Sequence, residues 1–355
     1  MAKQTLAVKY RPHSFDDVTE QNSIKIILQQ QLESGEFQHA YLFVGGAGTG
    51  KTTTARIFAD EINNHVGVPI ELDAASNSSV DDVRNIIQQA KTKSLDSEYK
   101  VFIIDECHSL SNTAWQAFLK LIEEPPAKSI FIFCTTNPEK IPKTILSRVQ
   151  RYDFKRISQK GIVDRLRYIL QQEDDGTETL YPNARATVDQ IYLSGALEYI
   201  AKLADGGMRD AITLMDKCLA YSSELTIDNI VKALGVADYS VMIDLTDSYI
   251  NTERKQIIKL IEQIHSDGKD LKQFVRQYID FILDIKKYMI LEDFSYISLP
   301  KIDSIETMLK NIKADEDRGS WDIISDLLDK LLKLNTDIKY DPAPKCIIEA
   351  VLIGG

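Results

Sequence analysis

The sequence predicts an α/β domain with a parallel sheet, followed by helical regions in the remainder of the chain. Up to about Phe154, short apolar runs alternate with amphipathic patterns of helical period, which is typical of a parallel sheet covered by helices. Beyond that point such runs stop, and apolar residues recur at spacings of three and four. A length of 355 residues fits two or three domains, and a hydrophobic content of 44% is enough to form their cores.

The elements of the first part follow from these runs in order. An amphipathic helix is expected at 22–33, and Gly35 ends it. Ser79 and Asp82 have the spacing of a capping box, and Pro125-Pro126 terminates a later helix. Strands are expected at 41–44, 69–72, 99–104 and 129–135, and helices at 52–63, 79–92 and 112–124. The near-continuous apolar strands suit the centre of a parallel sheet.

The second part is expected to be helical. The helical patterns lie at 161–172, 195–220, 257–264 and 271–291, with a charged break at 315–319. A polar stretch around 176–193 separates the first two of these helical patterns, and its purpose cannot be inferred from the sequence. We expect three domains, at 1–156, 157–222 and 223–355, with the α/β domain first.

A glycine-rich loop at 45–52 fits the phosphate-binding pattern of Gly, four residues, then Gly-Lys-Thr. Its glycines let backbone N–H groups cradle phosphate oxygens, at the start of a helix whose dipole favours anions. Lys51 would reach the β- and γ-phosphates of a nucleotide, and Thr52 would hold Mg²⁺. A chance match occurs in about one chain in a hundred of this length, and the flanking strand and helix make it less frequent still. The expected nucleotide contacts are Gly45, Gly46, Ala47, Gly48, Thr49, Gly50, Lys51, Thr52 and Thr53.

Polar residues follow two other strands at the ends where ligands bind in such sheets. Asp105 would support Mg²⁺, and Glu106 would orient or deprotonate the attacking water. An acidic turn is the alternative, which the distance of about 50 residues from the phosphate loop disfavours. Thr136 and Asn137 could position the water beside the γ-phosphate, although such residues before Pro138 commonly form just a turn.

Charge and cysteine content exclude some classes of protein. The net charge of −11 argues against indiscriminate binding of polyanions, although the segment 140–167 is rich in Lys and Arg. The four cysteines are scattered, so we expect neither zinc nor a disulfide framework. No apolar run is long enough to span a membrane, and the residues after Met1 lack the pattern of a signal peptide, so a cytoplasmic location is expected.

Together these stretches resemble the AAA+ clamp-loader ATPases, and most closely the gamma/tau subunits of bacterial DNA polymerase III. The matching segments are collinear over about residues 6–216. They are Lys9-Tyr10-Arg11-Pro12, Phe15 to Val18, His39 to the phosphate loop, Glu71 to Asn77, Ile104 to Ser111, Leu121 to Pro126, Ile145 to Arg148 and Ala204 to Ala211.

The resemblance implies roles that spacing alone does not assign. Arg148 would be the arginine finger that enters the ATP site of a neighbouring subunit, and Arg209 the sensor arginine of a helical lid domain. Thr136 matches the sensor position on the sheet, with Asn137 beside it. The adenine pocket would include Tyr10, Arg11 and Pro12, and the DNA-tracking chamber Arg84, Lys91 and Lys93. The three domains would then be an AAA+ domain, a lid and a helical collar.

The chain also departs from the family pattern. Where gamma/tau subunits usually carry a four-cysteine zinc module, the segment 63–68 has no cysteine, so zinc is not carried over. Val149 replaces the usual cysteine after the finger arginine. His108 has no partner at metal-binding spacing, and we expect it to be structural. A compact clamp loader of phage-like or divergent origin fits these departures.

The expected function is that of an ATPase subunit in a pentamer-like ring, which opens a sliding clamp and places it on primer–template DNA during replication. Hydrolysis of ATP would trigger release of the clamp. ATP and Mg²⁺ are the expected cofactors, and no polymerase activity is expected from this chain alone. The alternatives are a branch-migration type of AAA+ motor and a loader subunit that binds nucleotide without hydrolysing it.

Overall fold

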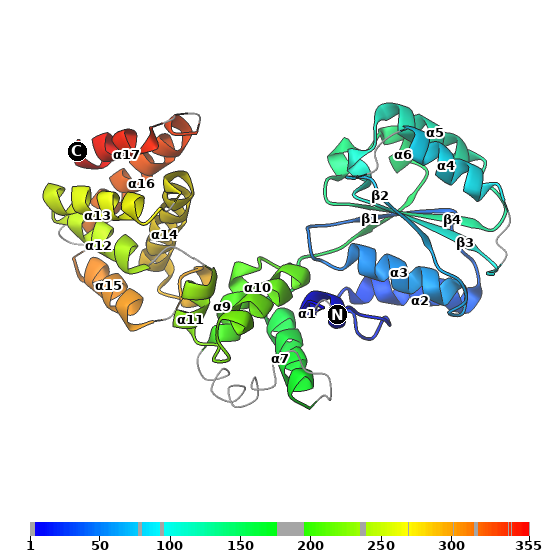
Figure 1. The fold of residues 1–355 in the computed structure, drawn as a ribbon, viewed down its shortest axis with the longest axis horizontal. Helices are drawn as coiled ribbons and strands as arrows, with labels where there is room; N and C mark the ends of the chain where they lie inside the picture. The colour runs from blue at the N-terminus through cyan, green and yellow to red at the C-terminus, as the bar shows by residue number, and fades with distance from the viewer. Residues whose placement is uncertain are drawn as a thin grey trace. The chain divides into compact units, whose positions relative to one another are not determined.

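The computed structural model describes residues 4–76, 80–92, 96–175, 195–234, 239–268, 270–300, 302–315, 319–339, 341 and 343–354. The chain divides into two compact units. Unit 1 comprises Met1–Val188 and Ile200–Asp216, and unit 2 comprises Asp189–Tyr199 and Lys217–Gly355. Each unit is described by itself, and Figure 1 shows the elements of both.

The described part of unit 1 is built on a parallel sheet of five strands in the order β2-β3-β4-β1-β5. The strands are β1 (Ala40–Val44), β2 (Ile70–Asp73), β3 (Lys100–Asp105), β4 (Ser129–Thr135) and β5 (Gln150–Asp153). Strand β1 lies between β4 and β5, and its last residue, Val44, is in register with Thr135 at the end of β4. The residues that follow these two strands therefore start from the same edge of the sheet.

Helices cover both faces of this sheet, as Figure 1 shows. One face packs against α2 (Asn22–Ser34) and α3 (Lys51–Ile62) through a core that includes Phe58. The other packs against α4 (Val80–Ala90), α5 (Asn112–Glu123) and α6 (Lys143–Leu146) around Phe118. The other helices that lie wholly or partly in unit 1 are α1 (Leu6–Lys9), α7 (Gln159–Asp175), α9 (Ala196–Leu203) and α10 (Met208–Tyr221), of which α9 and α10 each cross the division between the units.

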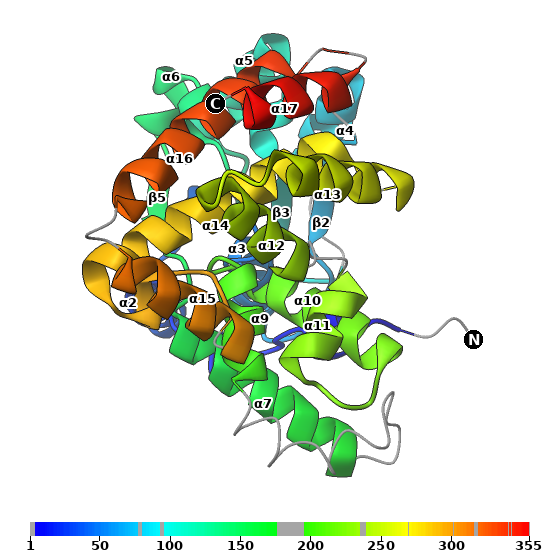
Figure 2. The same ribbon diagram turned by 90° about the vertical axis from the view of Figure 1, so that its left-hand side faces the viewer.

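Unit 2 is helical in its described residues. Its remaining helices are α11 (Ile227–Leu234), α12 (Tyr239–Ile250), α13 (Arg254–Ser266), α14 (Leu271–Leu291), α15 (Asp303–Ala314), α16 (Ser320–Asp337) and α17 (Pro344–Ile353). Figure 2 faces this bundle, in which α14 packs against α16 and contributes the fully buried Tyr278 and Ile282 to one continuous core. None of the helices among the described residues is long and apolar enough to cross a membrane.

The α/β plus all-α fold class is confirmed, and two local expectations need correction. Strand β5 was not anticipated, because Gln150-Arg151-Tyr152-Asp153 has no apolar run. The pattern at 195–220 is two helices, since Gly206 adopts a φ of +82° between them. Ser79 and the stretch 176–193 lie outside the described residues, and the domain boundaries at 156 and 222 stay predictions.

Candidate nucleotide-binding site

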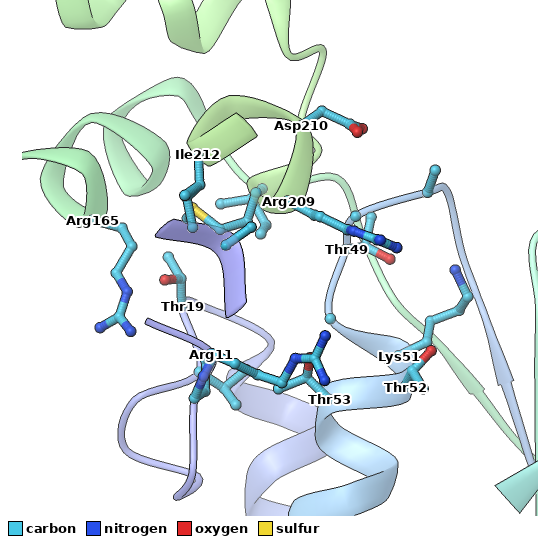
Figure 3. Close-up of a pocket in the computed structure, with 18 of the residues that line it drawn as sticks. Arg11, Thr19, Thr49, Lys51, Thr52, Thr53, Arg165, Arg209, Asp210 and Ile212 are labelled. Carbon is cyan, nitrogen blue, oxygen red and sulfur yellow. The ribbon is translucent and has the colours of Figure 1, made fainter. Parts of the chain in front are cut away.

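A cavity of about 320 Å³ lies in unit 1, beside the phosphate loop. This volume is at the lower end of the range for pockets that hold small-molecule ligands. Figure 3 shows side chains converging on it from the loop, from α3, from α7 and from α10. Of the residues predicted from the sequence, it is lined by Tyr10, Arg11, Pro12, Ala47, Gly48, Thr49, Gly50, Lys51, Thr52, Thr53, Asp105, Glu106 and Arg209.

The phosphate loop connects β1 to α3 in a conformation that glycine makes accessible. Gly48 and Gly50 have φ of +68° and +98°, a region that side-chain-bearing residues rarely adopt. The buried Lys51 ammonium donates hydrogen bonds to the carbonyls of Gly45 (2.9 Å) and Gly46 (2.8 Å). Burial lowers the pKa of Lys51, and the nearby Glu106 carboxylate acts in the opposite direction. The loop thus presents a cation and helix-start N–H groups to the cavity.

Hydroxyl and carboxylate oxygens meet beside the loop. Thr52 Oγ1 donates a hydrogen bond to Asp105 Oδ2 at 2.8 Å, and Asp105 Oδ1 accepts the backbone N–H of Glu106 at 3.0 Å. These are the oxygen donors that Mg²⁺ prefers. The donor set therefore fits the predicted Mg²⁺ site, although the described residues hold no group of three or more His, Cys, Asp and Glu that could bind a metal by themselves.

The predicted water-activating residue is held by neighbours. Glu106 has a φ of +44°, an uncommon conformation for a residue with a side chain. Thr136 Oγ1 donates a hydrogen bond to Glu106 Oε2 at 3.1 Å. His108 Nδ1 lies 3.2 Å from the same oxygen and 3.2 Å from Thr135 Oγ1. His108, which we expected to be purely structural, therefore contacts the candidate catalytic carboxylate.

Arginines give the lining of the cavity an excess of positive charge. Arg11, Arg56, Arg165 and Arg209 all line it. Burial lowers the pKa of Arg11, and the positive charges of Arg56 and Arg209 lower it further. Arg56 is held by Glu71 through two hydrogen bonds of 2.7 and 2.6 Å. This charge suits a polyanionic ligand. Arg56 belongs to no motif and was not predicted, whereas Arg165 lies within the basic segment 140–167 but could not be singled out there.

The lid contacts the phosphate loop directly. The backbone N–H of Met208, the first residue of α10, donates to the carbonyl of Gly48 at 2.9 Å. A Cβ placed on Gly48 would lie only 3.0 Å from the Cα of Gly207, so the two backbones approach closely. Arg209, the next residue of α10, reaches the cavity beside Thr49 (Figure 3).

Other predicted residues lie outside the cavity lining. Arg148 is exposed. Its Nη2 lies 2.9 Å from Glu123 Oε1, and its Nη1 donates a hydrogen bond to the carbonyl of Thr144 at 2.8 Å. Arg84 and Lys91 are exposed on α4 and just after it, and Lys93 lies outside the described residues. The predicted site residues that the structure describes but that do not line the cavity are Gly45, Gly46, Thr136, Asn137, Arg148, Arg84 and Lys91.

Three family models match separate parts of the chain. The model of the DNA polymerase III delta subunit matches residues 63–158. The model of the ATPase lid domain of the DNA polymerase III clamp loader subunit matches 191–224. The model of domain III of the gamma and tau subunits of DNA polymerase III matches 225–353.

Curated relatives extend these matches. The tau subunit of DNA polymerase III from Bacillus subtilis is 34% identical over 99% of this chain and 63% of its own length. The tau subunit from Escherichia coli is 31% identical over 76% of this chain and 43% of its own length. The chain thus spans less than two thirds of these relatives. Among solved structures, the RuvB Holliday junction branch migration motor of Thermotoga maritima is 19% identical, with a TM-score of 0.48 over 74% of this chain and 86% of that one.

Proposed function

Because the chain belongs to the DNA polymerase III gamma/tau family of clamp-loader subunits, we propose that it is an ATPase that loads a sliding clamp onto primer–template DNA. The supporting observation is that Lys51, Thr52 with Asp105, and Glu106 border one cationic cavity that Arg209 of the lid also reaches. We propose the domain boundaries 1–156, 157–222 and 223–355 for its AAA+ domain, lid and collar.

In this mechanism the chain's own residues bind and orient ATP. The loop backbone and Lys51 hold the phosphates, and Arg11 and Arg209 add positive charge around them. Mg²⁺, held by Thr52 and Asp105, would neutralise charge on the β- and γ-phosphates. Glu106 orients the attacking water, and Thr136 fixes its carboxylate through the 3.1 Å hydrogen bond.

The arginine finger belongs to the assembly rather than to the subunit. Arg148 and its ion-pair partner Glu123 are both exposed, so a neighbouring subunit could reach the arginine. An arginine supplied in trans contributes on the order of 10³–10⁵ in rate in other phosphoryl-transfer enzymes. ATP would then stabilise one arrangement of neighbouring subunits, and loss of the γ-phosphate would end that preference and release the clamp.

The test is ATP turnover by the assembled protein with and without primed DNA and a sliding clamp. We expect stimulation by DNA and clamp together, loss of hydrolysis but retained ATP-dependent assembly in Glu106→Gln, and slow hydrolysis in Arg148→Ala. The exposed Glu36→Gln is the matched control and should behave as the wild type.

Three outcomes would contradict parts of the proposal. Wild-type turnover in Arg148→Ala would remove the shared-site mechanism. Stimulation by four-way junctions in place of primed DNA would favour a branch-migration motor. No turnover by the wild type under any condition would favour a scaffold subunit. A ring of several subunits, a cytoplasmic location and the absence of zinc stay predictions.

A further inference from the structure

Tyr10, which lines the cavity, is held at both of its ends by one lid helix. Its hydroxyl donates to Glu173 Oε1 at 2.7 Å, and Arg165 Nη2 donates to its backbone carbonyl at 3.0 Å. Both partners belong to α7 and are eight residues apart, so they lie on one face of that helix about 12 Å apart along its axis. The ring of Tyr10 is therefore fixed relative to α7.

The carboxylate that receives Tyr10 is fully buried. The Glu173 side chain has no exposed surface, and Lys9 Nζ also donates to its Oε1, at 2.6 Å. A buried carboxylate is stable only when charged and polar partners satisfy it. Burial, together with the hydrogen bond to Glu173, raises the pKa of Tyr10, so its hydroxyl remains a donor. Tyr10 cannot turn away from α7 without leaving Glu173 with fewer partners.

The same N-terminal segment is also attached to the helix that carries Arg209. The backbone N–H of Leu6 donates to Asp216 Oδ2 on α10 at 3.2 Å. Residues 6–10 thus contact both α7 and α10 within unit 1. The wall of the cavity that Tyr10 forms is therefore attached to α7 and α10.

The cavity has two chemically different ends. In Figure 3, Lys51 and Thr52 lie at one end, while Thr19, Ile212 and Arg165 lie away from them. The lining contributed by Pro12, Val18 and Ile212 is apolar, which suits the flat face of a base rather than phosphates. Tyr10 belongs to the same N-terminal segment as Pro12.

We propose that Glu173 and Arg165 are positioning residues that hold Tyr10 as a wall of the nucleoside end, so that α7 responds to the nucleoside of ATP independently of its phosphates. This inference rests on the proposed function, because it requires the cavity to bind ATP. Helix α7, which carries none of the motif residues, would then contribute to the affinity for ATP.

The experiment compares binding of ATP and of inorganic tripolyphosphate, each with Mg²⁺, to the full chain by calorimetric titration. Tyr10→Phe removes the hydroxyl but leaves the ion pair of Lys9 with Glu173, and Glu173→Gln removes the charge. We expect each variant to bind ATP about tenfold more weakly, because Tyr10→Phe removes the hydrogen bond and Glu173→Gln removes its charged acceptor, so that the ring is held less firmly as a wall for the nucleoside. Binding of tripolyphosphate should stay within about twofold, because the phosphate loop is unchanged.

Controls separate this inference from the proposed function. Asp164→Asn changes an exposed carboxylate of α7 that lies 3.7 Å from Arg167, and it should alter neither affinity. Lys51→Ala should bind neither ATP nor tripolyphosphate. A wild-type protein that binds no ATP would contradict the proposed function itself. Equal losses of ATP and tripolyphosphate, or wild-type ATP binding in Tyr10→Phe, would overturn the role of α7. If Glu173→Gln has a lower melting temperature than the wild type in the absence of ligand, the affinities of Tyr10→Phe alone test the role of α7.

Discussion

Replacing Gly48 by alanine tests the contact between the phosphate loop and the lid. The φ of +68° costs an alanine about 1 kcal/mol. The new Cβ would lie 3.0 Å from Gly207 Cα and 3.3 Å from the backbone nitrogen of Arg209. Both neighbours are backbone and must move, which weakens the 2.9 Å hydrogen bond from Met208 to Gly48, worth about 1 kcal/mol. The φ strain is present whether or not the lid touches the loop, so only the second term disfavours the lid contact, by about 1 kcal/mol.

The assay is amide hydrogen exchange of the segment around Met208, read by mass spectrometry. A loss of about 1 kcal/mol corresponds to roughly fivefold faster exchange. Gly46→Ala is the matched control, because its Cβ would meet only Thr49 Cγ2, at 3.8 Å. Its exchange should remain within about twofold of the wild type. A folded Gly48→Ala protein with wild-type exchange at Met208 would show that the loop does not hold the lid.

Three further predictions concern other contacts. His108→Leu should lower kcat for ATP hydrolysis about tenfold at constant KM, because it removes the contact with Glu106. His108→Asn, whose amide nitrogen can replace Nδ1, should keep kcat within about threefold of the wild-type value. Equal losses of kcat in the two variants would refute a positioning role. Asn63→Ala should lower the free energy of unfolding by about 2 kcal/mol in urea, because the side chain makes two 2.9 Å hydrogen bonds to the backbone of Tyr99. Hydrogen bonding from Lys330 lowers the pKa of Asp326 below 3.8, so this carboxylate stabilises the fold above that value and ceases to do so as the pH falls through the lowered pKa. Asp326→Asn should therefore lower the free energy of unfolding by less than about 1 kcal/mol at pH 7, since the carboxylate is largely exposed. The difference in melting temperature between variant and wild type should vanish in strong acid. An equal difference at pH 7 and in strong acid would contradict this.

Local composition predicted those elements that are buried on two sides. The bounds of β4, Ser129–Thr135, match the expected strand because every residue of it is buried and nearly all are apolar. Strand β5 was missed because Gln150–Asp153 is largely polar, and only its pairing with β1 makes it a strand. Such pairing depends on residues more than a hundred positions away, which no local pattern records.

The same distinction applies to the candidate site. Residues of contiguous motifs, such as Lys51 and Asp105, could be placed from sequence because their chemistry fixes their spacing. Glu173 could not, since 163 positions separate it from Tyr10 and a single buried glutamate has no signature. His108 was visible in the sequence, but its contact with Glu106 depends on the turn of Cys107–Ser109 that follows β3.

Helices α10 and α7 contact two different parts of the cavity wall. Met208 meets the phosphate loop at Gly48, while Glu173 meets the segment that carries Tyr10. A ligand shifts a conformational equilibrium only by its differential contacts with the two states. Tripolyphosphate has no nucleoside, so in the proposed site it would make no contact with the wall that Tyr10 forms. ATP, bound as proposed, would contact both the phosphate loop and this wall and should therefore restrain α7 and α10 more than tripolyphosphate does, which is the property that a nucleotide-driven switch requires.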